Sequence, residues 1–345
     1  YNDKKVNELY HIDSIVDLVK QHIKRNDVFP SNIDIVTGGF PCQDFSVAGK
    51  RKGFKSSKGH LGSKIEDYED PKIENRGMLY YWMREVIRLT NPKLFIAENV
   101  KGLVSLTNVK EIIEKDFKTI GEKGFTVIPA QIINVADYGV SQNRERVIFF
   151  GFNNEFINGT ASFQLNKLNI GNDFDPYPDK THGNNVFNND NTYLENYVPL
   201  KSILHELAEP EDETDDLSQI TYSKARFYGT HVQGQTEISL ESVSPTIRAE
   251  HHGNIEFRRL SFENAGKNIA ELNLGLKQRR LTVRECAQIQ TFPMDYEFVI
   301  KKGKNRYFDV SGSEAYRLIG NAVPPFFAYH VARNIMSKWQ KYFGE

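Results

Sequence analysis

Apolar residues recur at helical spacing several times before residue 125. In residues 12–25, one helical face collects Ile12, Val16, Val19 and Ile23. Residues 77–90 repeat this spacing and stop at Asn91, because the residue before a proline disfavours helical backbone. Residues 109–124 show a further helical pattern that ends in a glycine, a common helix terminator. Each of these segments predicts a helix.

Apolar segments without helical spacing alternate with the helices. They predict strands over residues 32–40, 93–100, 125–135 and 145–152. An order of strand, helix, strand, helix is typical of a mostly parallel sheet with helices on its faces. We therefore expect an α/β fold up to about residue 152.

The pattern changes in the second half of the chain. Residues 153–276 are rich in Asn, Asp and Gly, have weak periodicity and include an acidic run at 206–216, which we interpret as a solvated surface segment. This composition predicts a smaller, irregular second domain. From residue 277 a helical pattern returns, and the last helix places Phe327, Val331, Ile335 and Trp339 on one face. We expect that helix to pack back on the first sheet.

The bulk composition excludes several classes of protein. The chain has 345 residues, a formal net charge of −1 and 2 cysteines. So few cysteines cannot build a disulfide framework or a multi-cysteine zinc site, so we expect no metal and a reducing, cytoplasmic compartment. Apolar runs stay well below the ~20 residues that span a membrane, so we expect no membrane association. Any nucleic-acid surface must be local, because the whole molecule is not a polycation.

Polar clusters follow the predicted strands. They occupy residues 41–43, 98–100, 142–146 and 320–325. Cys42 stands between a proline and a glutamine instead of in an apolar run, just past the end of a predicted strand. In open α/β sheets, ligands bind at the carboxyl ends of the strands. We therefore interpret Cys42 as a functional residue. Cys286 lies in a helical apolar pattern, so we predict that it is a core residue. Trp82 and Trp339 are also predicted core residues.

The segments GGFPCQDFSVAG, ENV, QNRERV, RRLTVRECAQIQTFP and GNAVPP, in this order, resemble the signature blocks of bacterial DNA (cytosine-5) methyltransferases of restriction–modification type. The resemblance implies a mostly parallel Rossmann-like methyltransferase sheet with helices on both faces, plus a smaller irregular β-rich target-recognition domain. It implies a catalytic domain at 1–152, the target-recognition domain at 153–276, and a segment at 277–345 that returns to the catalytic domain.

The resemblance also implies a reaction. A methyl group passes from S-adenosylmethionine to carbon 5 of a flipped cytosine in a specific double-stranded DNA sequence, through a covalent bond between a cysteine and C6. Cys42 would be the nucleophile, Glu98 would act at N3, and Arg146 would hold O2. Arg144 would help to position the loop, and Asn99 would position Cys42 or the exocyclic amine.

The remaining site residues follow from the same resemblance. The cofactor would contact Pro41, Leu79, Asn321 and Val323, with Asp13 as the acid that receives the adenine amine. The loop after Cys42 is basic and would contact the DNA through Gln43, Ser46, Lys50, Arg51, Lys52 and Lys55; the alternative is a merely solvated loop. Thr246 and Arg248 would contact the DNA near the flipped base. We expect a monomer on double-stranded DNA, in the bacterial cytosol and associated with the nucleoid.

The chain departs from the family pattern at one place. Family members carry a Phe-x-Gly-x-Gly turn after the first strand and an acid that holds the ribose; neither motif is found in these 345 residues. Three hypotheses would explain this departure: a missing N-terminal segment, a subunit of a split enzyme, or a degenerate relative. We favour the first and expect weak cofactor binding by this chain without the segment.

Two other functions stay open from the sequence. One is RNA cytosine-5 methylation, although the Cys-Phe-Thr signature of the tRNA-directed branch is not found. The other is a non-catalytic DNA-binding fragment or subunit of a split enzyme. Binding of S-adenosylmethionine distinguishes this last function from an active enzyme.

Overall fold

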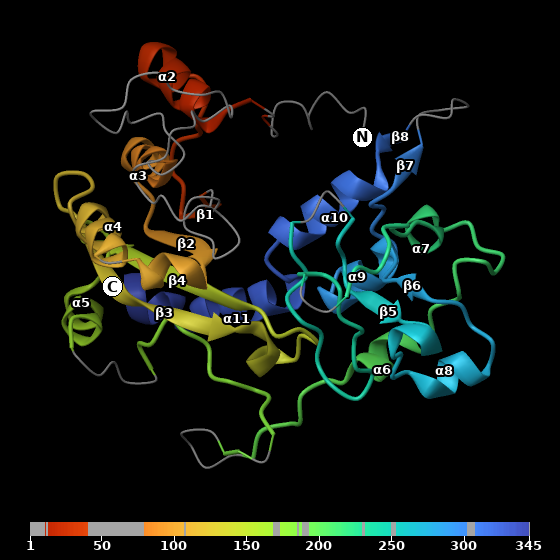
Figure 1. Ribbon diagram of the computed structural model, residues 1–345. Coiled ribbons are helices and arrows are strands. Elements are labelled where there is room, and N and C mark those ends of the chain that lie inside the picture. Colours follow the sequence, from red (N-terminus) through yellow and green to blue (C-terminus); the bar gives the residue numbers. More distant parts are fainter. Residues whose placement is uncertain are drawn as a thin grey trace. The chain divides into compact units, whose positions relative to one another are not determined.

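A computed structural model of the protein describes residues 11, 13–40, 79–106, 108–167, 173–184, 186–187, 193–229, 232–249, 253–301 and 308–344. The chain divides into two compact units (Figure 1). Unit 1 comprises 1–133, 145–176 and 336–345, and unit 2 comprises 134–144 and 177–335. The three-part division expected from the sequence stays a prediction.

Unit 1 is built on a sheet with the strand order β1-β2-β4-β3. The strands are β1 (Ile35–Gly39), β2 (Leu94–Val100), β4 (Glu145–Asn153) and β3 (Phe125–Asn134). β1 and β2 are parallel and pair Gly39 with Glu98. β2 and β4 are antiparallel and pair Glu98 with Ile148. The predicted α/β class is confirmed.

The direction of β4 departs from a wholly parallel arrangement. β3 and β4 are neighbours joined by residues 135–144, which include the short helix η4 (Val135–Tyr138). A parallel neighbour needs a crossover of about a dozen residues or more, usually a helix. The connection between β3 and β4 is too short for such a crossover, so the chain reverses its direction there. On its other side, β4 runs antiparallel to β2.

Helices cover both faces of the sheet in unit 1. Phe95 and Phe149 pack on α3 (Leu79–Thr90) and α4 (Val109–Lys118), in a cluster with Met83 and Phe117. On the other face, Phe152 contacts rings of α11 (Pro325–Phe343): the centroid distances are 4.7 Å to Tyr342 and 6.1 Å to Phe343. The predicted return of the C-terminal helix to the first sheet is therefore confirmed.

The N-terminal helix α2 (Ile15–Arg25) packs on α3. Ser14 caps its first turn, and Asn26 ends it in the left-handed region. Val16, Val19, Leu79 and Trp82 form the shared cluster. Trp82 is a core residue, as predicted, whereas Trp339 is only half-buried. Unit 1 also contains η3 (Lys101–Ser105) and α5 (Gly159–Leu165).

Unit 2 consists of short elements. They are α6 (Leu200–Leu204), α7 (Leu217–Ile220), β5 (Phe257–Arg259), η5 (Phe262–Asn264), α8 (Ile269–Asn273), β6 (Arg279–Arg280), α9 (Val283–Ile289), β7 (Ile300–Lys301), β8 (Phe308–Val310) and α10 (Gly312–Asn321). Strands β5 and β6 pair, as do β7 and β8. Cys286 is fully buried in the core of this unit, as predicted, and burial raises the pKa of its thiol well above the ordinary value.

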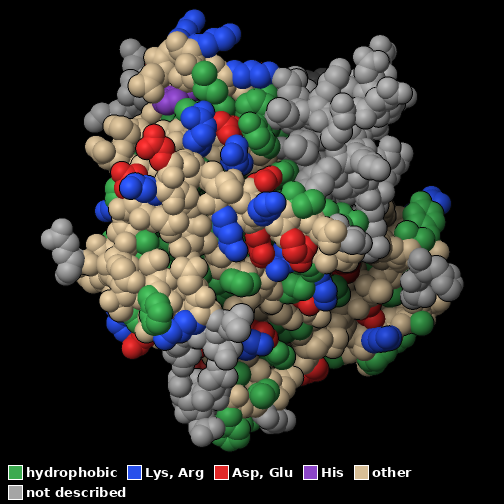
Figure 2. All heavy atoms as spheres, turned by 90° about the vertical axis from the view of Figure 1, so that its left-hand side faces the viewer, with side chains coloured by type: hydrophobic (Ala, Val, Ile, Leu, Met, Phe, Trp, Pro, Cys, Tyr) green, Lys and Arg blue, Asp and Glu red, His purple; other side chains and the backbone are tan. Residues whose placement is uncertain are grey.

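Basic and acidic side chains are mixed on the face seen in Figure 2 instead of forming one basic patch. Among the described residues, no helix is long and apolar enough to cross a membrane, and no cluster of His, Cys, Asp or Glu fits a metal ion.

The acidic run at 206–216 is not simply a solvated segment, which corrects the prediction. Glu209 binds Arg279 with an Nε–Oε2 distance of 2.9 Å and also binds Arg259. Asp216 pairs with Arg284. The side chains of these three arginines are 1–4% exposed. A buried guanidinium needs a charged partner, so part of the acidic run folds inward to supply it.

Acid is expected to weaken unit 2 through Glu209. The guanidinium groups of Arg279 and Arg259 overcome the effect of burial and lower the pKa of Glu209 from 4.5 to about 2. A lowered carboxyl pKa contributes stability above pH 4.5 that is lost as pH falls towards about 2. Denaturant unfolding of Glu209→Gln across this window should show a shallower pH dependence than wild type.

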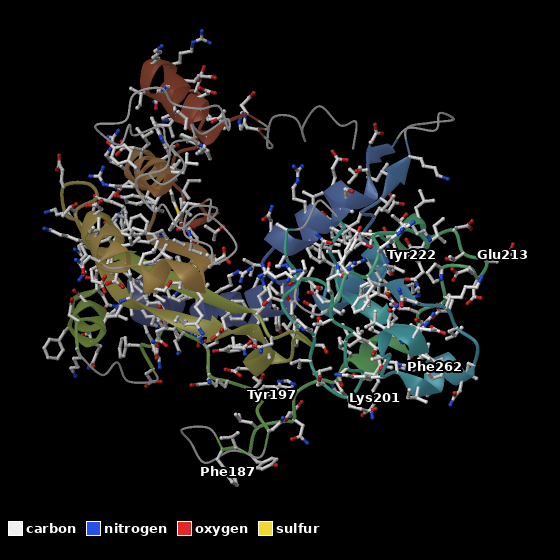
Figure 3. The ribbon with its side chains drawn as sticks, viewed as in Figure 1. Phe187, Tyr197, Lys201, Glu213, Tyr222 and Phe262 are labelled. Carbon is white, nitrogen blue, oxygen red and sulfur yellow. The ribbon has the colours of Figure 1, made fainter. Side chains whose placement is uncertain are left out.

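The matched control is Glu213→Gln, in the same acidic run. Glu213 is exposed and projects outward at the edge of unit 2 (Figure 3). It should keep the pH dependence of wild type. Equal pH slopes for Glu209→Gln and wild type would contradict the role of the buried pair.

Candidate active site

Glu98 and Arg146 form an ion pair on neighbouring strands of unit 1. β2 and β4 pair Val100 with Arg146 and Glu98 with Ile148, which makes Glu98 and Arg146 diagonal neighbours on one face. The distance from Arg146 Nε to Glu98 Oε1 is 2.8 Å, and the side chains are 12% and 18% exposed. The sequence predicted that both residues act on one base, and the structure brings them into contact.

Gly39 leaves space for the carboxylate of Glu98. It is the last residue of β1 and pairs with Glu98 across the sheet. A Cβ atom at position 39 would lie 3.2 Å from Glu98 Oε2, closer than ordinary van der Waals contact. Oε1 therefore faces Arg146, and Oε2 lies on the side of Gly39.

Asn99 anchors the chain that leads to Cys42. Its side chain is 1% exposed. Nδ2 donates to the Phe40 carbonyl at 3.2 Å, and Oδ1 accepts from the Val100 amide at 2.8 Å. Phe40 is itself buried in the core of unit 1. Both predicted partners of Asn99 stay untested, but its bond to Phe40 lies two positions before the cysteine.

Several predicted site residues lie outside the described residues. They are Pro41, Cys42, Gln43, Ser46, Lys50, Arg51, Lys52 and Lys55. Their assigned roles stay predictions.

Arg144 has different partners from Arg146. Its guanidinium donates to the carbonyls of Ile247, Gly320 and Ala322 at 3.0, 2.8 and 2.9 Å, all within unit 2. The side chain is only 1% exposed. Arg144 precedes β4, which begins at Glu145, so the two arginines do not share this strand. These bonds fit the predicted role of Arg144 in positioning a loop, which stays a prediction.

Thr246 and Arg248 lie in an extended segment of unit 2. The half-buried Thr246 donates its hydroxyl to the Asn143 carbonyl at 2.7 Å. Arg248 lies 3.3 Å from the carboxylate of Glu256 and donates to the Asn254 carbonyl at 3.0 Å. Burial raises the pKa of Glu256, which the nearby Arg248 partly offsets. Their predicted contacts with DNA stay untested.

The predicted cofactor residues are found in both units. In unit 1, Asp13 is exposed beside the cap of α2, whereas Leu79 is 7% exposed and packs on Val16 and Val19. In unit 2, Asn321 is the exposed last residue of α10, and Val323 is half-buried. The exposed carboxylate and amide fit a polar ligand; Leu79 serves the packing of two helices.

Sequence reasoning missed a buried pair of glutamines in unit 2. Gln142 and Gln290 are both 0% exposed, and Gln142 Nε2 donates to Gln290 Oε1 at 3.1 Å. The available signal was the polar Gln290 on the helical face that Val283, Cys286 and Ala287 otherwise make apolar.

Comparison with known proteins decides the family. The sequence profile of the C-5 cytosine-specific DNA methylases matches residues 2–337. The chain belongs to this family. Among relatives, the type II methyltransferase M.FnuDI of Fusobacterium nucleatum is 28% identical over 342 residues, which cover 96% of this chain and 85% of the relative. M.NgoPII of Neisseria gonorrhoeae is 30% identical over 319 residues, covering 91% of this chain and 79% of the relative.

A solved structure has the same fold. The Dnmt2 methyltransferase of S. pombe has a TM-score of 0.52 and 17% identity, and covers 95% of this chain and 83% of its own. Membership of the family makes this protein a DNA cytosine-5 methyltransferase, with S-adenosylmethionine as the methyl donor. The prediction of the family and of its activity is confirmed.

The methylase motif GNAVPP contains a glycine with a steric role. A Cβ atom at Gly320 would lie 2.2 Å from the carbonyl carbon of Arg248 and 2.3 Å from the amide nitrogen of Ala249. Gly320→Ala is therefore expected to lower the melting temperature by several degrees, since overpacking costs about 1–3 kcal/mol. Calorimetry on both proteins measures this.

Gly159→Ala is the control for this change. A Cβ atom at Gly159, the first residue of α5, would meet open space. That variant should melt close to wild type. If Gly320→Ala has the same melting temperature as Gly159→Ala, the peptide between Arg248 and Ala249 does not require a glycine at position 320.

Proposed function

We propose that Cys42, Glu98 and Arg146 methylate a flipped cytosine in a specific double-stranded sequence, as the modification enzyme of a restriction–modification system. The observation that carries the proposal is the 2.8 Å pair of Glu98 and Arg146, beside the end of β1. Cys42 follows the anchored Phe40 by two positions, and two residues of chain span at most ~7 Å. The proposal therefore puts the thiol near this pair.

The chain's own groups account for the activation of cytosine. The Cys42 thiolate forms a bond to C6, and the electrons of the C5–C6 double bond move to C5, which becomes nucleophilic. S-adenosylmethionine supplies an electrophilic methyl group when it is bound. After methylation, the C5 proton leaves to a base and the bond between sulfur and C6 breaks, so the aromatic ring and the thiolate are regenerated.

Glu98 and Arg146 act on the polar edge of the ring. Addition at C6 drives negative charge onto N3. Glu98, protonated for this step, gives its proton to that nitrogen and takes it back when the bond between sulfur and C6 breaks. Arg146 holds the carboxyl group through Oε1 and donates to O2 of the base. Thymine carries a proton at N3 and cannot accept one there, so Glu98 also selects cytosine.

The cofactor and the DNA would contact the residues that the family resemblance assigns to them. Asp13 and Asn321 would hold the polar groups of S-adenosylmethionine, with Pro41, Leu79 and Val323 as apolar contacts. The loop after Cys42 would hold the phosphates, and Thr246 with Arg248 would contact the DNA near the flipped base. A monomeric enzyme on DNA, a cytosolic location and an additional N-terminal segment or subunit belong to this proposal.

Bisulfite sequencing tests the proposed function. A plasmid is incubated with S-adenosylmethionine and the protein supplied with its proposed N-terminal segment, and total RNA serves as a parallel substrate. We expect methylated cytosines at one short sequence of the plasmid. Methylation confined to RNA, or plasmid methylation without sequence preference, would contradict the proposal.

A further inference from the structure

The segment of residues 244–247 in unit 2 is held by Gln142, which carries no assigned role in methyl transfer, together with Arg144. Its centre is Ile247, whose side chain is 0% exposed in the unit 2 core. The Ile247 amide donates to Gln142 Oε1 at 3.0 Å, and its carbonyl accepts from Arg144 Nη1 at 3.0 Å. Both backbone polar groups and the side chain of one residue are therefore fixed.

The bond from Gln142 continues through a second buried amide. Gln142 Nε2 donates to Gln290 Oε1 at 3.1 Å, and Gln290 Nε2 donates to the carbonyl of Ile319 in α10. One end of this relay is an N–H group, which only donates, and the other is a carbonyl, which only accepts. The orientation of both amides is therefore determined, and every member has a partner.

We propose that Gln142 and Gln290 are positioning residues for sequence recognition. This inference rests on the proposed function, in which the neighbours of Ile247, Thr246 and Arg248, contact the DNA. The relay ties the backbone between these two residues to α10. The backbone that carries their side chains is therefore held in place. A less rigid backbone at these residues lowers the free-energy penalty for binding a wrong DNA sequence, because the protein can rearrange its mismatched contacts.

Gln142→Met removes the relay while it keeps the side chain's length. It leaves the Ile247 amide without its acceptor, so the segment is free to shift. We expect the KM for DNA to rise about tenfold and kcat to change little, as for lost uniform binding. The KM for S-adenosylmethionine should stay near the wild-type value, and bisulfite sequencing of a random duplex library should show methylation at additional sequences.

Gln219→Met is the matched control in the same unit. Gln219 is 3% exposed, donates to the Ala208 carbonyl and accepts from Thr282. Its removal also breaks buried amide bonds, yet none of them reaches residues 244–248. We expect a lower melting temperature with an unchanged sequence preference and an unchanged KM for DNA.

Gln290→Met provides a second variant if Gln142→Met does not fold. It breaks the relay at Ile319 but keeps the bond from Ile247 to Gln142, so the same changes should be smaller. A folded Gln142→Met or Gln290→Met that matches Gln219→Met in KM for DNA and in sequence preference would overturn the inference alone. A wild-type protein that methylates no DNA would overturn the proposed function, and this inference with it.

Discussion

Replacing Cys42 by serine is expected to lower methyl transfer by roughly 10⁴-fold or more, because loss of a covalent nucleophile removes the reaction path itself. A serine hydroxyl has no comparable anionic form near neutral pH, so it does not add to C6. DNA binding should change little, since the exchange leaves the basic residues of the chain unchanged. Radiolabelled methyl transfer and fluorescence anisotropy with a duplex measure the two quantities.

Cys286→Ala is the control for the thiol. This cysteine is fully buried, and burial raises its pKa, so its thiol is a poor nucleophile. The variant should be less stable but should keep its turnover at moderate temperature. Methyl transfer by Cys42→Ser at the wild-type rate, or its loss in a folded Cys286→Ala, would contradict the assignment of the nucleophile.

Glu98→Gln is expected to slow methyl transfer by about 10² or more, the usual contribution of a general acid. Glutamine keeps a hydrogen-bonding group beside Arg146 but cannot give a proton to N3 without a further source. It also removes the negative charge that lies 2.8 Å from Arg146 Nε. The rate at saturating DNA and S-adenosylmethionine isolates this effect from binding.

Glu145→Gln is the matched control for this change. Glu145 is the residue before Arg146, and its carboxylate pairs with Lys101 at 2.8 Å, with side chains that are 41% and 54% exposed. An exposed pair of this kind contributes little to stability. Equal rates for Glu98→Gln and Glu145→Gln would show that N3 is activated by another group.

The local elements were largely predictable from the sequence. The helical patterns at 12–25 and 77–90 correspond to α2 (Ile15–Arg25) and α3 (Leu79–Thr90). Burial of Cys286 and the return of α11 to the sheet also follow from apolar spacing, because a helix with one apolar face must cover it. These features depend on residues close together in the chain.

Features that depend on distant parts of the chain were not predictable. Pairing of Glu98 with Arg146 requires the register of β2 and β4, which apolar periodicity does not contain. The role of Gly320 depends on the backbone at Arg248, and the glutamine relay joins residues 142 and 290. The sequence around Glu209 predicts a solvated acid, because its buried arginine partners lie far away in the chain.

A duplex with 5-fluorocytosine at the methylated position tests directly whether Cys42 forms the covalent bond to C6. Fluorine at C5 cannot leave as a proton does, so the enzyme stays attached to the DNA after methylation. Incubation with S-adenosylmethionine, proteolysis and mass spectrometry of the DNA-linked peptide identify the residue. We predict an adduct on the peptide that contains Cys42. An adduct on Cys286, or none from a protein that methylates the unmodified duplex, would contradict the account.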